Sequence, residues 1–270
     1  MLKDISIGQY FPGKSAIHKM DPRVKIILTF SYIIMLFLVK NALGFLIAIA
    51  FLLLVIFIAK IPVRAIFKSV KPILPLIIFT SVLNMFFITG TPIFHWWIFT
   101  ITSEGLSIAI IMSIRIVCLI IGSSLLTYTT SPIALTDAIE RLLKPLKYIK
   151  FPVHEMAMMM TIALRFIPTL IEETDKIMSA QKARGADLET GGLVKRAKAL
   201  IPILIPLFVS AFRRAEELAL AMECRCYRGG EGRTRMKQLK LSLIDFTSTG
   251  VMVITFTAVI VINIYVPMLF

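Results

Sequence analysis

The sequence predicts an all-α integral membrane protein with about five transmembrane helices and three long amphipathic cytoplasmic helices. Of its 270 residues, 57% are hydrophobic and only 17% are charged, and the mean hydropathy is +0.85. A soluble domain has about a quarter of its residues charged. The apolar residues also gather in long runs, and a spanning helix needs about 20 of them.

Five apolar runs predict the spanning helices. They cover residues 24–39, 42–59, 72–88, 106–128 and 246–270. The first run is short, and only Lys40 and Asn41 separate it from the second. Two interpretations of this pair therefore stay open, namely two full spans or one tight helical hairpin.

The distribution of Lys and Arg predicts the orientation in the membrane. Basic residues precede the first run and separate the second from the third: Lys14, Lys19, Arg23, Lys25, Lys60, Arg64, Lys68 and Lys71. Residues 90–103 carry none, and they hold His95, Trp96 and Trp97, which are typical of a membrane interface. Since basic loops stay in the cytoplasm, the N-terminus and residues 131–245 are predicted to be cytoplasmic. A net charge of +14 can indicate binding to nucleic acid or to anionic lipid headgroups, but in a chain with long apolar runs the same bias is the simpler explanation.

Residues 131–245 form the unusual part of the chain. They hold nineteen of the thirty Lys and Arg residues and thirteen of the sixteen Asp and Glu residues. The pattern predicts three long amphipathic helices, which begin after Ser131, Pro152 and Gly192. The predicted domains are therefore a membrane domain over 1–130, a cytoplasmic or interfacial domain over 131–245, and a final spanning helix over 246–270.

The stretch from Gly8 to Ser15 matches the phosphate-loop pattern G-x-x-x-x-G-K-[ST]. Such a loop needs a strand before it and a long helix after it. Only seven residues precede this one, and Asp21-Pro22 limits any following helix to about one turn. We interpret the match as coincidental and predict no catalytic residues in this chain.

Other chemical motifs are incomplete. His154-Glu155 begins an H-E-x-x-H pattern, but position 158 is methionine, and Cys224 and Cys226 have no second pair of ligands. No metal site is predicted. Arg115 lies inside the fourth apolar run, where a charge is costly unless it is paired. It is either a functional residue or a structural one that bonds to backbone carbonyls.

Two predicted cytoplasmic helices end in the same way. Ala183-Arg184-Gly185 ends one helix, and Cys224-Arg225-Cys226 ends the next. An Arg at a helix C-terminus suits the helix dipole and leaves its guanidinium free for a bidentate contact with a carboxylate of another protein. A solvated terminal Arg is common on one helix, but two matching ends favour a contact site.

Methionines gather at the start of the second amphipathic helix, at positions 156, 158, 159 and 160. Packing in a core is the simpler interpretation. The alternative is a pliable surface that adapts to several partners, because the thioether side chain is unbranched.

Four blocks of sequence carry a resemblance to a known family. They are SAIHKMDPRVKI at 15–26, LLTYTTSPIALTDAIERLLKPLK at 125–147, LRFIPTLIEETDKIMSAQKARGAD at 164–187 and AMECRCYRGGEGRTRM at 221–236. The chain resembles the transmembrane T components of energy-coupling factor transporters, the family that includes the cobalt-transport protein CbiQ. The resemblance covers nearly the whole length.

The resemblance implies a subunit of the bacterial cell membrane that couples two cytoplasmic ABC-type ATPases to a small membrane protein that binds the substrate. It assigns the ATPase contact to Ala183, Arg184 and Gly185, and more loosely to Cys224, Arg225 and Cys226. It gives Met156, Met159 and Met160 a place against the substrate-binding subunit. ATP and magnesium would be used by the ATPases, with no cofactor on this chain.

The last block is similar to the type that serves several vitamin-binding subunits, which favours vitamin uptake over cobalt or nickel. Two alternatives from other classes are a membrane enzyme and a self-contained permease. The enzyme would need clustered His, Cys or carboxylate groups, and the permease would need polar groups in several spans. The sequence offers little of either.

Overall fold

The structure is a computed structural model, which describes residues 10–88, 91–96, 99–186, 192–229 and 239–265. The chain divides into two compact units. The bundle unit comprises the described residues of 8–135 and 238–270, and the helix-pair unit comprises those of 136–237. The boundary between them falls inside one short helix, after Leu135.

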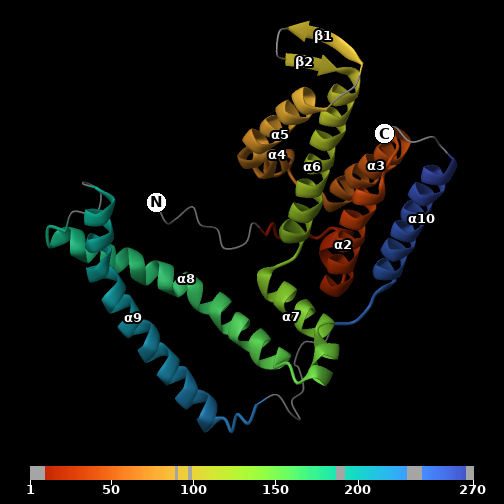
Figure 1. The fold of residues 1–270 in the computed structure, drawn as a ribbon. Coiled ribbons are helices and arrows are strands. Elements are labelled where there is room, and N and C mark those ends of the chain that lie inside the picture. Colours follow the sequence, from red (N-terminus) through yellow and green to blue (C-terminus); the bar gives the residue numbers. More distant parts are fainter. Residues whose placement is uncertain (1–9, 89–90, 97–98, 187–191, 230–238, 266–270) are drawn as a thin grey trace. The chain divides into compact units, whose positions relative to one another are not determined.

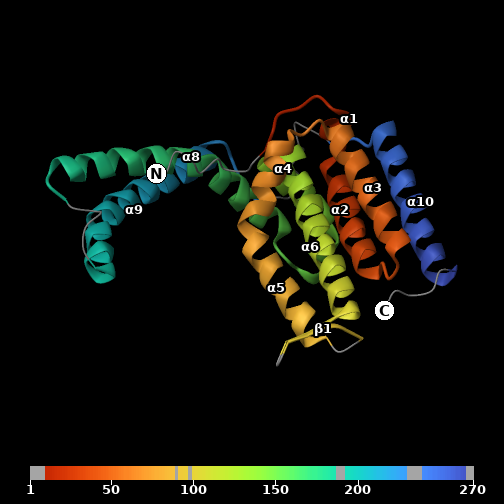
Figure 2. The same ribbon diagram turned by 90° about the horizontal axis from the view of Figure 1, so that it is seen from above.

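The bundle unit consists of helices that lie side by side, with a small hairpin at one end (Figures 1 and 2). Its elements are α1 (Ala16–Lys19), α2 (Pro22–Leu38), α3 (Ala42–Ala59), α4 (Val63–Val70), a 3₁₀ turn (Lys71–Ile73), α5 (Leu74–Phe87), β1 (Pro92–Trp96), β2 (Phe99–Thr102), α6 (Ser103–Thr129) and α10 (Leu243–Tyr265).

Four helices of the described chain are long and apolar enough to cross a membrane. They are α3, the bent α4–α5 segment (Val63–Phe87), α6 and α10. The fifth predicted span, α2, has 17 residues, which at about 1.5 Å per residue is slightly shorter than the hydrocarbon layer. It is a separate helix that packs against α6 and α10. The prediction of an all-α membrane protein is confirmed.

Local sequence explains where these helices begin. Asp21 is the N-cap of α2, its Oδ1 accepts the Arg23 N–H at 2.9 Å, and Pro22 occupies the first helical position, where no backbone donor is needed. At α6, the Thr102 Oγ1 accepts the Gly105 N–H at 3.1 Å and donates to the Ile88 carbonyl at 2.8 Å. The cap of α6 thus also fixes the end of α5.

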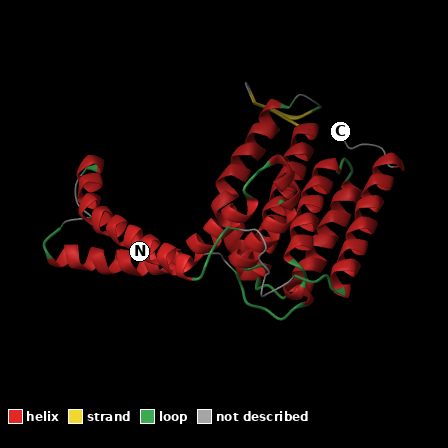
Figure 3. Cartoon of the chain, turned by 90° about the horizontal axis from the view of Figure 1, so that it is seen from below, coloured by secondary structure: helices red, strands yellow, loops and turns green. Residues whose placement is uncertain are grey.

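The hairpin is a difference from the predicted fold, which contained no strands. β1 and β2 pair antiparallel, with His95 opposite Thr100 and Trp96 opposite Phe99, and Figure 3 shows them as the short yellow element among helices. Aromatic and β-branched residues favour extended backbone, and such residues make up most of β1 and β2. Of the predicted interface residues, Trp97 lies outside the described residues.

The core of the bundle forms where α2, α3, α6 and α10 meet. Tyr32, Met35 and Leu36 of α2 are buried with Ala48 of α3, and the Tyr32 hydroxyl donates to the Ala48 carbonyl at 3.3 Å. Gly122 of α6 faces the Tyr32 ring, and a Cβ there would lie 2.8 Å from it. The close approach of α2 and α6 therefore requires glycine at this position.

Buried charges join the bundle at the end where α2 and α10 begin. The Asp245 carboxylate accepts the Asp21 N–H at 2.8 Å and the Ser242 N–H at 2.7 Å. The buried Lys25 Nζ donates to the Thr129 carbonyl, at the end of α6, at 2.9 Å. Because an unpaired buried charge is costly, the Asp245–Asp21 bond fixes the start of α10 to the start of α2, and the Lys25–Thr129 bond fixes α2 to the end of α6.

The helix-pair unit differs from the prediction of three long helices. It contains α8 (Val153–Ala183) and α9 (Leu193–Cys224), with 31 and 32 residues, but α7 (Pro132–Leu142) has only 11 and is followed by a 3₁₀ segment (Lys144–Ile149). The first predicted helix is therefore wrong in length. Pro145 has no backbone N–H to continue the helix, and its ring collides with the preceding turn.

Candidate functional site

The helices α8 and α9 form an antiparallel pair. The Gln181 side chain, near the end of α8, donates to the Pro202 carbonyl, near the start of α9, at 3.4 Å. At the opposite end, the Tyr227 hydroxyl donates to the Met158 Sδ at 3.1 Å. The two predicted contact segments, each at the C-terminus of its helix, therefore lie at opposite ends of the pair.

A polar contact in the middle holds the two helices together. The Glu173 carboxylate of α8 accepts a short hydrogen bond from the Ser210 hydroxyl and forms an ion pair with Arg214 at 3.1 Å, both on α9. The Ser210 hydrogen bond and the Arg214 charge lower the pKa of this carboxyl below its usual value. This contact joins the middle of α8 to the second half of α9. In the first half of α9, which holds Pro202 and Pro206, Figures 1 and 2 show a bend.

The α8 end closes with a Schellman motif. Arg184 is the C-cap, with φ −85°, and the next residue, Gly185, has φ +82°. The Gly185 N–H donates to the Lys182 carbonyl at 3.0 Å and the Ala186 N–H to the Gln181 carbonyl at 3.0 Å. Glycine is required here because the left-handed backbone has a steric cost for other residues.

The α9 end closes with the same hydrogen-bond pattern. Arg225 is the C-cap, with φ −92°. The Cys226 N–H donates to the Glu223 carbonyl at 2.8 Å and the Tyr227 N–H to the Met222 carbonyl at 3.0 Å. Cys226 takes the position of Gly185 with φ +57°, although it has a Cβ. In the sequence, the two segments share only the central arginine. In the structure, each residue of one segment has the same backbone role as its counterpart in the other.

Both arginines are presented to solvent. Arg184 and Arg225 are exposed, and within the part of the chain that the structure describes neither guanidinium has a hydrogen bond or an ion pair. Arg225 lies two residues before Tyr227, and Tyr227 contacts Met158 near the start of α8. Arg184, at the end of α8, is 26 positions further along that helix than Met158. At about 1.5 Å per residue, the two arginines are about 40 Å apart along α8.

The predicted methionine surface is partly exposed. Met159 is 61% exposed and Met160 is 46% exposed, whereas Met156 is half-buried. A second apolar surface on α9 was not predicted. It consists of exposed residues four apart, Leu204, Phe208 and Phe212, with Ile205 and Val209 beside them. The spacing of four can be seen in the sequence, but only the structure shows that no described element of the helix-pair unit covers these side chains.

Arg115 belongs to the bundle unit, on α6. Its Nη2 donates to the Val39 carbonyl at 3.1 Å, and its guanidinium carbon lies 5.2 Å from the centre of the Phe45 ring. Val39 is the C-cap of α2, whose carbonyl has no partner within its own helix. Of the two interpretations of Arg115, this geometry fits the structural one.

The phosphate-loop match has no nucleotide-binding geometry among the described residues 10–15. The helix that follows, α1, has four residues, and Ser15 caps it by accepting the His18 N–H. A Cβ on Gly13 would lie 2.6 Å from the His18 ring, so the loop packs closely around that ring. Burial of the ring lowers the pKa of His18 below its usual value. In the described parts of the chain, no three His, Cys, Asp or Glu residues group as metal ligands.

The two helix ends predict opposite effects of substitution. We expect Gly185→Ala to cost about 1 kcal/mol in the left-handed backbone, so that amides 182–186 exchange about fivefold faster. Cys226→Gly should relieve the same strain and slow exchange at 223–227. Gly192→Ala is the control, because Gly192 does not need a positive φ. Hydrogen-exchange mass spectrometry measures the exchange rates of all three variants. Faster exchange at residues 223–227 in Cys226→Gly would contradict the proposed backbone strain at Cys226.

Comparison with known proteins identifies the family. The family model described as cobalt transport protein, CbiQ, matches residues 13–236. The energy-coupling factor transporter transmembrane protein EcfT of Ruminiclostridium cellulolyticum is 58% identical over 260 residues, 96% of this chain and 97% of the relative. EcfT of Clostridium kluyveri is 59% identical over 251 residues, 92% of this chain and 93% of the relative. The chain therefore belongs to the CbiQ family, as a transmembrane component of energy-coupling factor transporters.

Proposed function

We propose that this chain couples two cytoplasmic ATPases to a separate membrane subunit that binds the substrate. The observation that carries the proposal is the pair of matching helix ends. Each end presents an exposed C-cap arginine held by the same backbone hydrogen bonds. The backbone hydrogen bonds fix where each arginine leaves the helix, and its exposed guanidinium is available for a bidentate contact with a carboxylate on a partner.

The distance between the ends supports a contact with two partners. Arg184 and Arg225 lie at opposite ends of one antiparallel pair, about 40 Å apart along α8, so one globular ATPase can occupy each end. The ATPases would bind and hydrolyse ATP with magnesium, and this chain would hold no cofactor. Their motion would be carried by α8 and α9, because a helical pair joined at Glu173 and Arg214 transmits a displacement that a flexible linker would absorb.

The exposed apolar residues of the same pair are the proposed contact for the substrate-binding subunit. On α8, Met159 and Met160 are exposed and Met156 is half-buried, and on α9 the stripe of Leu204, Phe208 and Phe212 is exposed. Large exposed apolar patches mark protein or membrane contacts. Methionine at such a surface can adapt to several partners, which suits a subunit shared among substrate-binding proteins.

The proposed substrate class is a vitamin, on the resemblance of residues 221–236 to the shared type of subunit. Uptake of cobalt or nickel is the second candidate, because the matching family model is described as a cobalt transport protein. The proposed orientation places the N-terminus and the helix-pair unit in the cytoplasm, as the excess of Lys and Arg predicts.

The cysteines of the chain provide a test of the docking surface. Cys224 and Cys226 are exposed and Cys118 is buried. We expect a maleimide to alkylate Cys224 and Cys226 in the free chain and to spare Cys118. When the transporter's own ATPases are bound, both labelled cysteines should be protected, because they flank the docking arginine. Mass spectrometry of the alkylated peptides measures the result.

The matched control is a chain with Cys224→Ala and Cys226→Gly that carries Glu172→Cys. Glu172 is exposed on α8, 12 residues from Arg184. Its cysteine should be labelled equally with and without the ATPases. If Cys224 and Cys226 also stay fully reactive in the assembled complex, the proposed ATPase contact at the α9 end is wrong.

A further inference from the structure

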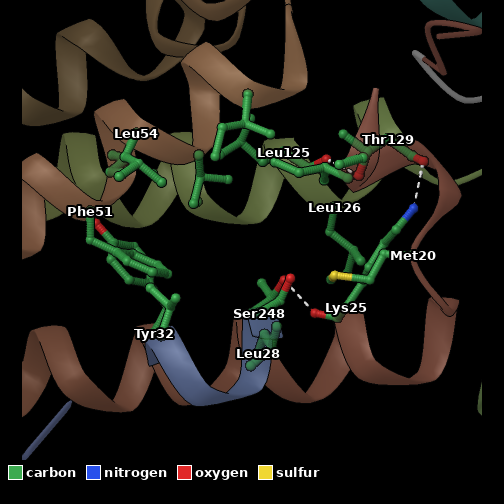
Figure 4. Close-up of a pocket in the computed structure, with 18 of the residues that line it drawn as sticks. Met20, Lys25, Leu28, Tyr32, Phe51, Leu54, Leu125, Leu126, Thr129 and Ser248 are labelled. Carbon is green, nitrogen blue, oxygen red and sulfur yellow. Dashed lines mark hydrogen bonds between the residues drawn. The ribbon is translucent and has the colours of Figure 1, made fainter. Parts of the chain in front are cut away.

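A cavity of about 360 Å³ lies inside the bundle unit, between the first half of α2, the second halves of α3 and α6, and the start of α10. Figure 4 shows side chains from these helices around it, including Leu28, Tyr32, Phe51, Leu54 and Leu126. Its volume is within the range of small-molecule binding sites. Neither the coupling role nor the ATPase contact uses it.

The polar groups at one end of the cavity are already satisfied. The Lys25 Nζ donates to the carbonyls of Thr129, at 2.9 Å, and His18, at 3.3 Å. The Thr29 hydroxyl donates to the Lys25 carbonyl, and the Thr129 hydroxyl to the Leu125 carbonyl, each at 2.8 Å. A buried water needs two to four free polar partners, so these groups do not favour water, and the remaining lining is mainly apolar.

The cavity opens to the outside of the bundle. Three lining residues are strongly exposed, Leu54 (50%) and Ile58 (40%) on α3 and Val251 (45%) on α10. Both helices are long and apolar enough to span a membrane, and a spanning arrangement would place this side against hydrocarbon. An empty apolar cavity forfeits the dispersion contacts of its lining, whereas a flexible chain that enters from the bilayer restores them.

The nearby end of the bundle carries exposed cations from three segments. Lys19 adjoins the lining residue Met20, Lys60 follows the lining residue Ile58 by two positions, and Lys240 precedes α10. All three are exposed. At this end of the bundle, the described carboxylates are those of Asp21 and Asp245, which are 4% and 2% exposed. The surface beside the cavity is therefore positive.

We propose that this cavity binds one anionic phospholipid. One acyl chain fills the space among α2, α3, α6 and α10, and the phosphate lies near Lys19, Lys60 and Lys240. Basic residues near a membrane surface attract anionic headgroups, and the neighbouring apolar cavity adds a place for the chain. This inference depends on membrane insertion and is independent of the coupling role.

Native mass spectrometry of the full chain tests the proposal. The chain is released from nanodiscs that contain equal amounts of phosphatidylglycerol and phosphatidylcholine, and retained lipids are counted. We expect one retained phosphatidylglycerol. Lys19→Gln with Lys60→Gln should reduce the preference over phosphatidylcholine about thirtyfold, because each surface cation contributes about 1 kcal/mol. Lys68→Gln, an exposed cation on α4 that does not border the cavity, should leave it unchanged.

Two variants fill the cavity. Leu126→Phe fills the interior of the cavity, and Val251→Trp blocks its opening. The second variant leaves the interior packing unchanged, so it still tests the proposal if the first variant does not fold. Either, once shown to be monodisperse, should lose the retained lipid. Retention that survives both substitutions overturns the proposal. Equal retention of the two lipids by the unmodified chain, or retention of detergent alone, overturns it as well.

Discussion

We expect Arg184→Ala and Arg225→Ala each to weaken ATPase binding by about 30-fold to 150-fold. A hydrogen-bonded charge that loses its partner in a protein interface costs about 2–3 kcal/mol, which corresponds to this range. Both guanidinium groups are exposed at helix C-caps, so their removal leaves no buried cavity. Substrate uptake should fall with binding, while insertion into the membrane stays intact.

The double variant tests whether the two arginines act on separate partners. Their separation of about 40 Å predicts that the two losses of binding free energy add, since distant sites without shared contacts are independent. Arg→Lys variants should recover only part of the affinity, because lysine cannot form the bidentate contact. Co-purification and surface binding measure both effects.

The control for this experiment is Arg228→Ala. Arg228 is exposed only three residues beyond Arg225 but does not occupy the cap position. It carries the same charge, so a general electrostatic attraction would make its removal equally harmful. Normal binding and transport by the Arg184 and Arg225 variants would show that the coupling role is wrong.

The second large effect is expected from Asp245→Ala, which should lower the free energy of unfolding by about 3–5 kcal/mol. The Asp245 carboxylate accepts the N–H groups of Asp21 and Ser242 and the Ser242 hydroxyl, at 2.7 to 3.0 Å, and it is 2% exposed. Its removal leaves buried donors without an acceptor and leaves Lys25 with less nearby negative charge. Thermal unfolding in detergent measures the loss.

Two variants make this prediction specific. Asp245→Asn keeps one acceptor oxygen and should lose less stability than Asp245→Ala. Thr247→Ala changes an exposed residue of the same helix, whose hydroxyl bonds only locally to the Ile244 carbonyl, and should be close to neutral. Equal melting of Asp245→Ala and Thr247→Ala contradicts a stabilising role for the buried carboxylate.

Much of the fold could be predicted because apolar runs have a direct physical meaning in a membrane. The runs that begin at residues 42, 106 and 246 correspond to α3, α6 and α10, since a run of about 20 apolar residues has few alternatives to a spanning helix. Shorter features were less well determined. Pro145 ended α7 early, and a short aromatic segment paired as β1 and β2 instead of remaining a loop.

The candidate site could be predicted only in part. The sequence shows an arginine at the predicted end of each of two helices. The family resemblance implies that these arginines contact the ATPases. That Cys226 takes the backbone conformation of Gly185 was not visible, because φ at a helix end depends on the hydrogen bonds that close it. The stripe of Leu204, Phe208 and Phe212 was overlooked because an apolar spacing of four is equally typical of a buried face.

By itself the sequence determined the protein class, most spanning helices and the fact that Arg184 and Arg225 each end a helix, because hydropathy, helix length and caps are local properties. Only the tertiary structure decided that Arg184 and Arg225 lie at opposite ends of one antiparallel pair, that Asp21 meets Asp245, and that helices distant in sequence line one apolar cavity. These features join residues that are distant in the chain, and their positions follow from packing and from the pairing of buried polar groups, which no local pattern encodes.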